Sequence, residues 1–322
     1  AENGDARRLM ENQKKKRPLN RQQKLMLNVL LVICCAALIF SGAMIANNYI
    51  REHQDRRRVA SDLSMFQNPS TVSDPDKDPY KDIVFPAGIL EQLKPFYARN
   101  SELAGFITID GIKDFGYPIV QAGDNEKYYR KNLDLKYSKE GTAFVDYKVN
   151  LIADSQNILV HGHNNKNGLM FGPLERYNAL LYGLDLYKKA PVIKLYNLTE
   201  VKEFKVVGFV VANVKWADGP TFDFTVTDLT DPEVFADFKA EVEARTVVDT
   251  GYYMEYGDTI LTLHSCCYYF KDVRFLVIAR ELRQGEDIEV DTSLAKVRYD
   301  AVMPDTFVDI YNLGTRASAY YQ

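Results

Sequence analysis

The hydrophobic and polar positions of this chain follow two different patterns. Residues 25–50 contain no charged side chain, and residues 25–45 are almost all apolar. From residue 103 onward, apolar residues come in short runs rich in Val, Ile, Phe, Tyr and Thr, separated by Gly, Asp, Asn and Pro. A long apolar run is typical of a membrane-spanning helix, whereas short punctuated runs are typical of strands.

The second part contains about eight such runs at regular spacing, which predict the strands of a barrel or a sandwich. A helix is expected to interrupt them at 231–245, because Asp231 is a good N-cap and Pro232 suits the first helical position. The predicted strands are LAGFITIDG, YPIVQ, GTAFVDY, NILVHGH, PVIKLYN, EFKVVGFVVANV, DTILTLHSC and RFLVIAREL.

The apolar run near the N-terminus predicts a membrane anchor, because a bilayer core of about 30 Å needs roughly 20 apolar helical residues. Residues 1–24 carry eight Lys and Arg, and residues 51–64 carry four. This bias predicts a cytoplasmic basic tail (1–24), an anchor (25–46) and an extracellular remainder that begins with a juxtamembrane helix and linker (47–86). The alternative is a cleaved signal peptide, since residues 41–43 are small.

Composition excludes several classes of function. The 322 residues carry a net charge of −4, so no global basic field attracts nucleic acid. The sequence has no zinc-finger spacing, phosphate loop or dinucleotide-binding glycine pattern, and it indicates no cofactor.

The cysteines point to chemistry. An extracellular domain lies where disulfides persist, yet Cys266 and Cys267 are sequence neighbours without a distant partner in that domain. Their Cα atoms are about 3.8 Å apart, below the usual range for a disulfide. The sequence therefore predicts a thiol kept for reactivity.

The histidines gather beside these cysteines. His161 and His163 end one predicted strand in ILVHGHNN, and His264 lies near the end of another in TLHSCC. Because side chains alternate along a strand, His264 and Cys266 share one face, and Ser265 and Cys267 share the other. Only one cysteine can therefore face a given cleft, and parity does not choose between them.

One interpretation of this cluster is a metal site. His161 and His163 can face one way, as can His264 and Cys266, and three His with one Cys would suit tetrahedral zinc. A nearby cation, Arg274, disfavours a metal. Another interpretation is a non-catalytic surface or adhesion protein.

A family resemblance favours catalysis. TLHSC resembles the TLxTC motif of sortases, with Ser265 in place of the usual threonine, and this makes Cys266 the nucleophile. Gly162-His163 is similar to the family's Gly-His, and Arg274 to the arginine on the strand after the cysteine. The helix at 231–245 and the helical N-terminal region resemble class B sortases in particular.

The resemblance covers roughly residues 87–282 and implies a mainly β fold. The expected fold is a closed barrel of about eight strands, with an N-terminal helical region and a helix inserted before the cysteine strand. The catalytic domain would span 87–285, followed by a C-terminal tail at 286–322.

The resemblance also implies the reaction. Cys266 would form a thioacyl-enzyme, Arg274 would stabilise the oxyanion, and His163 would serve as general acid and then general base. Class B sortases cleave Asn-Pro-x-Thr sorting motifs of surface proteins after the threonine. They transfer the product to an amine of a peptidoglycan precursor or to a pilin lysine. The enzyme would act on the extracellular face of the membrane.

Further roles follow from the same resemblance. Asn125 falls where the family contacts the sorting peptide, and His161, His264 and Ser265 are expected around the substrate. The family usually has tyrosine at the position of His161, and serine is common at that of His264.

Alternatives remain at some of these positions. Arg280, six residues after Arg274 and on the same strand face, is the alternative arginine, and Cys267 is expected to be inert. The competing activities are a membrane-anchored cysteine peptidase and an L,D-transpeptidase, although the Ser-His-Gly-Cys motif of the latter is absent.

Overall fold

The computed structural model of this chain describes residues 20–69, 80–151, 155–165 and 167–321. They fall into two compact units, Ala1–Gln54 and Asp55–Gln322. Most of the predicted basic tail, and residues 70–79 of the predicted juxtamembrane helix and linker (47–86), lie outside the described residues.

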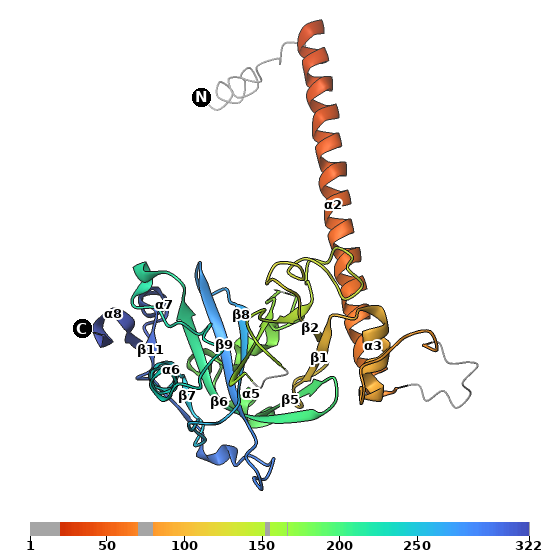
Figure 1. The fold of residues 1–322 in the computed structure, drawn as a ribbon. Helices are drawn as coiled ribbons and strands as arrows, with labels where there is room; N and C mark the ends of the chain where they lie inside the picture. The colour runs from red at the N-terminus through yellow and green to blue at the C-terminus, as the bar shows by residue number, and fades with distance from the viewer. Residues whose placement is uncertain (1–19, 70–79, 152–154, 166, 322) are drawn as a thin grey trace, which may run out of the picture. The chain divides into compact units, whose positions relative to one another are not determined.

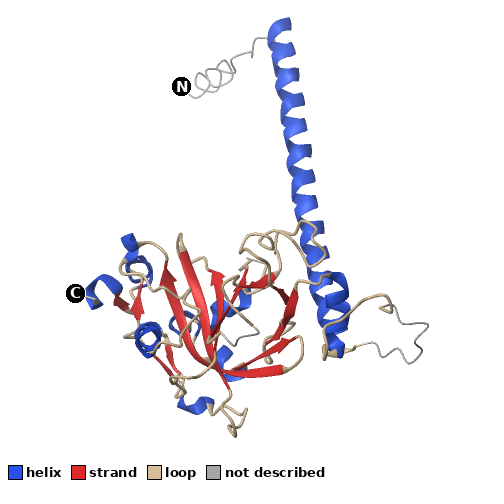
Figure 2. Ribbon diagram, viewed as in Figure 1, coloured by secondary structure: helices blue, strands red, loops and turns tan. Residues whose placement is uncertain are grey.

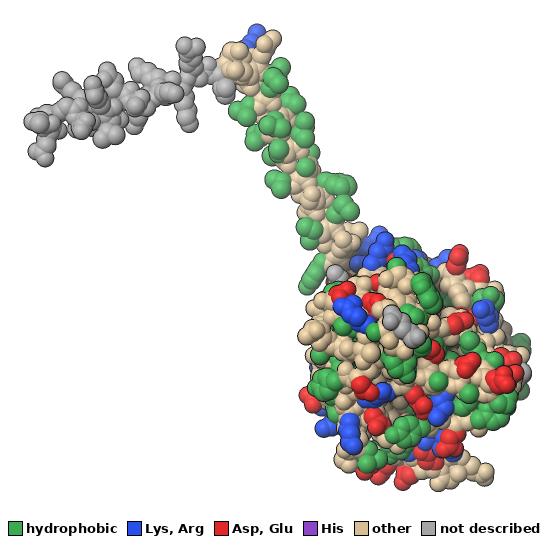
Figure 3. All heavy atoms as spheres, turned by 90° about the vertical axis from the view of Figure 1, so that its left-hand side faces the viewer, with side chains coloured by type: hydrophobic (Ala, Val, Ile, Leu, Met, Phe, Trp, Pro, Cys, Tyr) green, Lys and Arg blue, Asp and Glu red, His purple; other side chains and the backbone are tan. Residues whose placement is uncertain are grey.

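Helix α2 (Arg21–Gln67) contains the predicted anchor and continues without a break through the predicted juxtamembrane helix (Figure 1). Its large apolar side chains between Leu25 and Ile50 are exposed, and Figure 3 shows hydrophobic side chains along its surface. Among the described residues it is the one helix long and apolar enough to cross a membrane.

Eight strands close into a barrel in the order β1-β2-β3-β4-β8-β9-β6-β5 (Figures 1 and 2). Each of the eight apolar runs forms one of them, so the expected closed, mainly β barrel is confirmed. Their bounds are β1 Leu103–Thr108, β2 Gly116–Val120, β3 Ala143–Val145, β4 Asn157–Gly162, β5 Val192–Asn197, β6 Val201–Asn213, β8 Ile260–Cys266 and β9 Val273–Glu281.

Strand β8 lies between β4 and β9, and this arrangement positions the site. β4 and β8 run parallel, with His161 opposite His264 and Gly162 opposite Ser265. β8 and β9 run antiparallel, with Cys266 opposite Arg274. Residues opposite one another on neighbouring strands project from the same face of the sheet.

The predicted inserted helix is α6 (Pro232–Arg245), and it packs on the outside of the barrel. The side chain of Asp231 caps it by accepting hydrogen bonds from the amides of Glu233 and Val234. Phe238 and Val242 of α6 pack with Ile260 and other apolar residues of the outer face. The odd-numbered residues of β8, such as Leu261 and Leu263, enter the core inside the barrel.

Short elements complete the fold. They are η2 Glu91–Leu93, α3 Lys94–Arg99, η3 Gly172–Tyr177, α4 Ala179–Tyr182, α5 Asp185–Lys189, η4 Trp216–Asp218, β7 Val248–Asp249, η5 Thr292–Leu294, β10 Lys296–Val297, β11 Val302–Met303, α7 Asp305–Tyr311, β12 Thr315–Arg316 and α8 Ala317–Tyr320.

The C-terminal segment contains more structure than its sequence pattern indicates. Residues 283–322 show no clear period, yet Ala301, Met303 and Phe307 are each 0% exposed and belong to the main core. The stretch expected as a tail therefore contributes directly to the folded domain.

Candidate active site

Cys266 ends β8, and its side chain is half-buried and free of any disulfide. Residues of β8 alternate between the barrel interior and the outer face that α6 covers, and Cys266 shares the outer face with Ile260. Its opposite residue on β9 is Arg274, so thiol and guanidinium project from the same face.

His163 follows directly after β4, one position beyond the pair Gly162–Ser265. Its Nε2 lies 2.6 Å from the carbonyl oxygen of Tyr129 and donates to it, and the two rings are 4.2 Å apart. Burial lowers the pKa of His163, and the charge of Arg130 lowers it further, although the hydrogen bond to Tyr129 opposes the shift. The neutral imidazole, which can accept a proton, is therefore favoured.

Packing explains why the residue before His163, Gly162, is a glycine. A Cβ atom built at Gly162 would lie 2.4 Å from the ring of Phe171, which is fully buried. Only glycine lets the end of β4 approach this ring and so carry His163 to the level of Cys266.

Arg274 and Arg280 occupy different environments on β9. Arg274 is half-buried and donates from Nη1 to the carbonyl oxygen of Val273, 3.1 Å away. Arg280 is 3% exposed and forms two hydrogen bonds with Glu286, at 2.6 and 2.7 Å. Arg280 thus stabilises the fold, and Arg274 is the arginine beside the thiol.

Ser265 and Cys267 point away from this face, as strand parity predicts. Ser265 is 1% exposed, and its Oγ has no hydrogen-bond partner among the described residues. Cys267 packs in the main core, where burial, together with the charge of Glu175, raises the pKa of its thiol well above the usual value. Neither side chain is presented beside the Cys266 thiol.

His161 and His264 lie one level below Cys266, and their side chains meet. Their Nδ1 atoms are 2.7 Å apart, and Nε2 of His161 is 2.9 Å from Oδ2 of Asp146. His264 stacks on Phe224, with ring centroids 4.9 Å apart. The sequence analysis missed Asp146, although its position just after a predicted strand is a weak signal.

The pairing of the two histidines differs from a metal site. Their nitrogen atoms hydrogen-bond to each other instead of converging on a common point. Within the part of the chain that the structure describes, no group of three or more His, Cys, Asp or Glu side chains is arranged to hold a metal ion.

Asn125 supports the loop that carries Asp146. Its Nδ2 donates to Oδ2 of Asp146 at 2.8 Å, and its Oδ1 accepts from the amide of Tyr147 at 3.0 Å. Asn125 also lines an open groove of about 930 Å³ together with Tyr129, the residue that contacts His163. One residue of the groove lining, Tyr129, therefore contacts His163.

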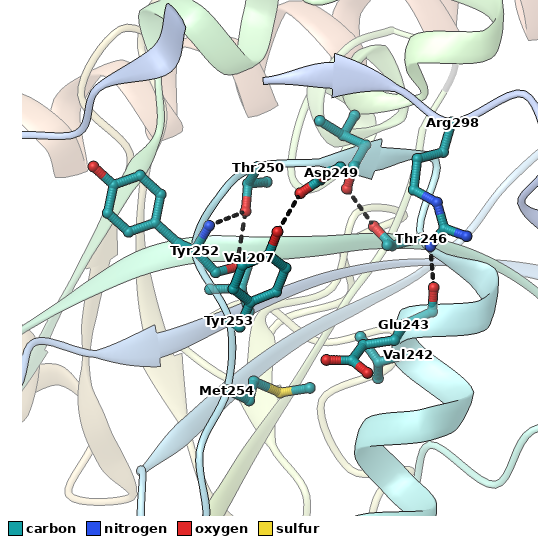
Figure 4. A pocket seen from close by; sticks show the side chains of 11 residues that line it. Val207, Val242, Glu243, Thr246, Asp249, Thr250, Tyr252, Tyr253, Met254 and Arg298 are labelled. Atoms are coloured by element: carbon teal, nitrogen blue, oxygen red, sulfur yellow. Dashed lines mark hydrogen bonds between the residues drawn. The ribbon is translucent and has the colours of Figure 1, made fainter. Parts of the chain in front are cut away.

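A separate cavity of about 270 Å³ lies between β6, β7, α6 and the C-terminal segment (Figure 4). Figure 4 shows Tyr253 bonded to Asp249, and Arg298 bonded to the backbone of Glu243. None of Cys266, His163 and Arg274 lines this cavity, and the side chains of Tyr253 and Arg298 are bonded to Asp249 and to the backbone of Glu243.

Comparison with known proteins gives a consistent result. No family model matches the chain. Sortase B of Listeria monocytogenes is 26% identical over 180 residues, which are 55% of this chain and 68% of the relative. Sortase B of Staphylococcus aureus is 21% identical over 248 residues, which are 76% of this chain and 92% of the relative.

The fold agrees with these sequence matches. The crystal structure of sortase B from Bacillus anthracis in complex with AAEK1 superposes with a TM-score of 0.59 at 21% identity, covering 73% of this chain and 99% of that structure. The resemblance inferred from the motifs is thus confirmed in sequence and in fold. In sequence and in fold, the chain is similar to class B sortases.

Proposed function

We propose that this sortase cleaves a C-terminal sorting motif with Cys266, assisted by His163 and Arg274. The observation that supports the proposal is the strand register. Cys266 lies opposite Arg274, and His163 lies just beyond the paired ends of β4 and β8. Segments more than 100 residues apart therefore bring a thiol, an imidazole and a guanidinium to one face.

The mechanism follows from these three groups. The Cys266 thiolate attacks the carbonyl carbon of the scissile peptide bond, and Arg274 donates hydrogen bonds to the oxyanion that forms. His163 gives a proton to the leaving amine as the thioacyl-enzyme forms. An incoming amine then attacks the thioester, His163 takes its proton, and Cys266 is released.

The proposed substrates are surface proteins with an Asn-Pro-x-Thr type motif, cleaved after threonine. The acceptor is an amine of a peptidoglycan precursor or a pilin lysine. The groove beside His163 is open enough for an extended peptide and is lined by Asn125 and Tyr129. Helix α2 supports anchoring in the cell membrane, with the N-terminus cytoplasmic and the barrel extracellular.

The test uses the full chain in detergent with a library of sorting peptides, with and without an amine nucleophile. We expect mass spectrometry to show an acyl adduct on Cys266, and a new amide product that increases with amine concentration. If the peptide is hydrolysed at a rate and yield unaffected by amine, the competing activity, a membrane-anchored cysteine peptidase, is correct.

A further inference from the structure

Below the level of Cys266, a hydrogen-bonded chain links three side chains from three segments. Asp146 follows β3, His161 lies on β4 and His264 lies on β8. The links are 2.9 Å from Oδ2 of Asp146 to Nε2 of His161, and 2.7 Å between the two Nδ1 atoms. His264 and Cys266 are alternate residues of β8, so their Cα atoms are about 7 Å apart on one face.

The charge of Asp146 fixes the direction of these hydrogen bonds. Burial raises the pKa of Asp146, but hydrogen bonds from His161, the Lys148 amide and Asn125 outweigh it and lower the pKa to about 2. The ionised carboxylate can only accept, so Nε2 of His161 carries the hydrogen.

The tautomer of His264 follows from this direction. In neutral His161, Nδ1 has a lone pair, so the Nδ1 atom of His264 must be the donor between the two rings. The Nε2 atom of neutral His264 is then an unprotonated base.

This Nε2 atom is buried, and it has no hydrogen-bond partner among the described residues. A buried polar atom without a partner destabilises the fold, so a functional reason for it is expected. The groups whose charges act on His264 are His161 on β4, Arg274 on β9 and Asp146 after β3, and Cys266 lies two residues away on its own strand. The ring of Phe224 covers one face of the imidazole.

We propose that Asp146, His161 and His264 store the proton that leaves the Cys266 thiol. The S–H bond of Cys266 breaks and an N–H bond forms at Nε2 of His264, once the thiol, two residues along the same face of β8, has moved within hydrogen-bond reach of that atom. The hydrogen shared by the two Nδ1 atoms moves from His264 to His161. The products are a thiolate at Cys266 and an imidazolium at His161 beside ionised Asp146, so charge is conserved.

The environment favours this final position of the charge. Burial, followed by the charges of His161 and Arg274, lowers the pKa of His264 well below the usual value, so charge does not rest on that ring. His161 contacts the carboxylate directly, so the positive charge is stabilised there. His163 does not hold this proton: its own protonated form gives a proton to the leaving amine, and its neutral form takes one from the incoming amine. The inference rests on the proposed role of Cys266 as nucleophile.

The first test measures alkylation of Cys266 by iodoacetamide from pH 5 to 10 in the full chain, read by peptide mass spectrometry. We expect each of the variants Asp146→Asn, His161→Gln and His264→Gln to raise the pH midpoint of Cys266 alkylation by about one unit. The alkylation rate reached at high pH should stay unchanged. Removing the carboxylate charge alone would lower the midpoint, so a rise in Asp146→Asn is specific to proton storage.

The matched control is Thr262→Val. Thr262 lies two residues before His264 on the same face of β8 and donates a buried hydrogen bond of 2.8 Å to Asn157. Loss of this hydrogen bond should lower the melting temperature without moving the pH midpoint of Cys266 alkylation. If Asp146→Asn and His264→Gln also lower only the melting temperature, the three residues are merely structural and the proposal is overturned.

The second test reads the tautomers directly by nitrogen NMR of the chain labelled at its four histidines. We expect hydrogen on Nδ1 of His264 in the wild type. In Asp146→Asn, the amide donor should reverse both bonds and place the hydrogen on Nε2. A wild-type His264 with hydrogen on Nε2 while His161 is neutral would overturn the proposal.

Both tests are independent of the sorting reaction. Midpoint shifts without any acyl adduct would reject the proposed function and keep the proton store. An acyl adduct with unshifted midpoints would support the proposed function and reject the proton store.

Discussion

At the scale of single residues, the neighbouring thiols of Cys266 and Cys267 have opposite surroundings. Cys266 is half-buried on the face that also carries Arg274, whereas Cys267 is 6% exposed and packed in the core. A thiol must ionise to act as a nucleophile, and burial disfavours the ionised form of Cys267. The position on the strand therefore separates a half-buried thiol beside an arginine from a thiol packed in the core.

Cys266→Ala should abolish the thioacyl adduct, because no other thiol lies on the face beside Arg274 in the described structure. Cys267→Ala should keep most of the transpeptidase turnover and lower only the melting temperature. Mass spectrometry of the adduct and a turnover assay measure the two effects. Loss of the adduct in Cys267→Ala alone would show that the motif is misaligned.

Arg274→Gln should lower turnover by about a hundredfold or more, because a donor to the oxyanion is lost, with little change in melting temperature. Arg280→Gln is the matched control. It removes both hydrogen bonds from Arg280 to Glu286, although Glu286 keeps its ion pair with Lys205, and should destabilise the fold by about 2 kcal/mol, with turnover retained at low temperature. If Arg280→Gln lowers turnover while Arg274→Gln lowers only stability, Arg280 is the arginine of the site.

The sequence predicts some of these residues better than others. Local spacing and family motifs point to Cys266, His163 and Arg274, and parity separates Cys266 from Cys267. Asp146 was not predicted, because its contact with His161 depends on how β3 pairs with β4. The bond between His161 and His264 was not predicted, because it depends on how β4 pairs with β8.

At the scale of elements, the eight strands were predictable because alternating apolar residues mark each one locally. The neighbours of each strand were not. β4 and β8 are separated by β5, β6 and α6 in the chain, yet they pair in parallel register. That register follows from the closure of the whole barrel, so no local pattern contains it.

The end of α2 approaches the segment before β3 through two carboxyl groups, Asp55 and Glu140. Glu140 is 3% exposed, and Asp55 also pairs with Arg58 at 2.8 Å. Burial, followed by the hydrogen bond and the charge of Asp55, raises the pKa of Glu140 to about 7. The protonated carboxyl is thus the form that the folded protein favours.

This shift makes stability depend on pH. Because the folded protein holds the proton of Glu140 more tightly, the stabilisation is complete below pH 4.5 and is lost as the pH rises through about 7. Glu140→Gln should remove this loss, which we expect to be about 2 kcal/mol. Denaturant unfolding from pH 4 to 8 measures it, with the surface variant Glu126→Gln as control. Parallel pH profiles for Glu140→Gln and wild type would contradict this prediction.

At the scale of the whole molecule, the C-terminal segment is a part of the enzyme domain. Phe307 of α7 is 0% exposed, and its ring packs against Tyr269, with centroids 5.5 Å apart. Tyr269 lies three residues after Cys266. The segment therefore supports the loop after Cys266 from the core side.

Phe307→Ala should destabilise the domain by about 3 kcal/mol, because a buried ring is removed and a cavity is left. Ile310→Ala, on the same helix but 53% exposed, should change stability by less than about 0.5 kcal/mol. Thermal unfolding of the full chain in detergent compares the two. Equal, small effects would show that α7 is dispensable for the domain.

The bond between His161 and His264 also has an evolutionary consequence. Replacing one of the two rings leaves the Nδ1 atom of the other without its partner in a largely dry environment, which makes single substitutions unfavourable. Substitutions at these two positions during evolution should therefore be correlated, although 103 residues separate them along the chain. Descendants of this protein should keep both histidines or lose both, and an intermediate with only one should be rare.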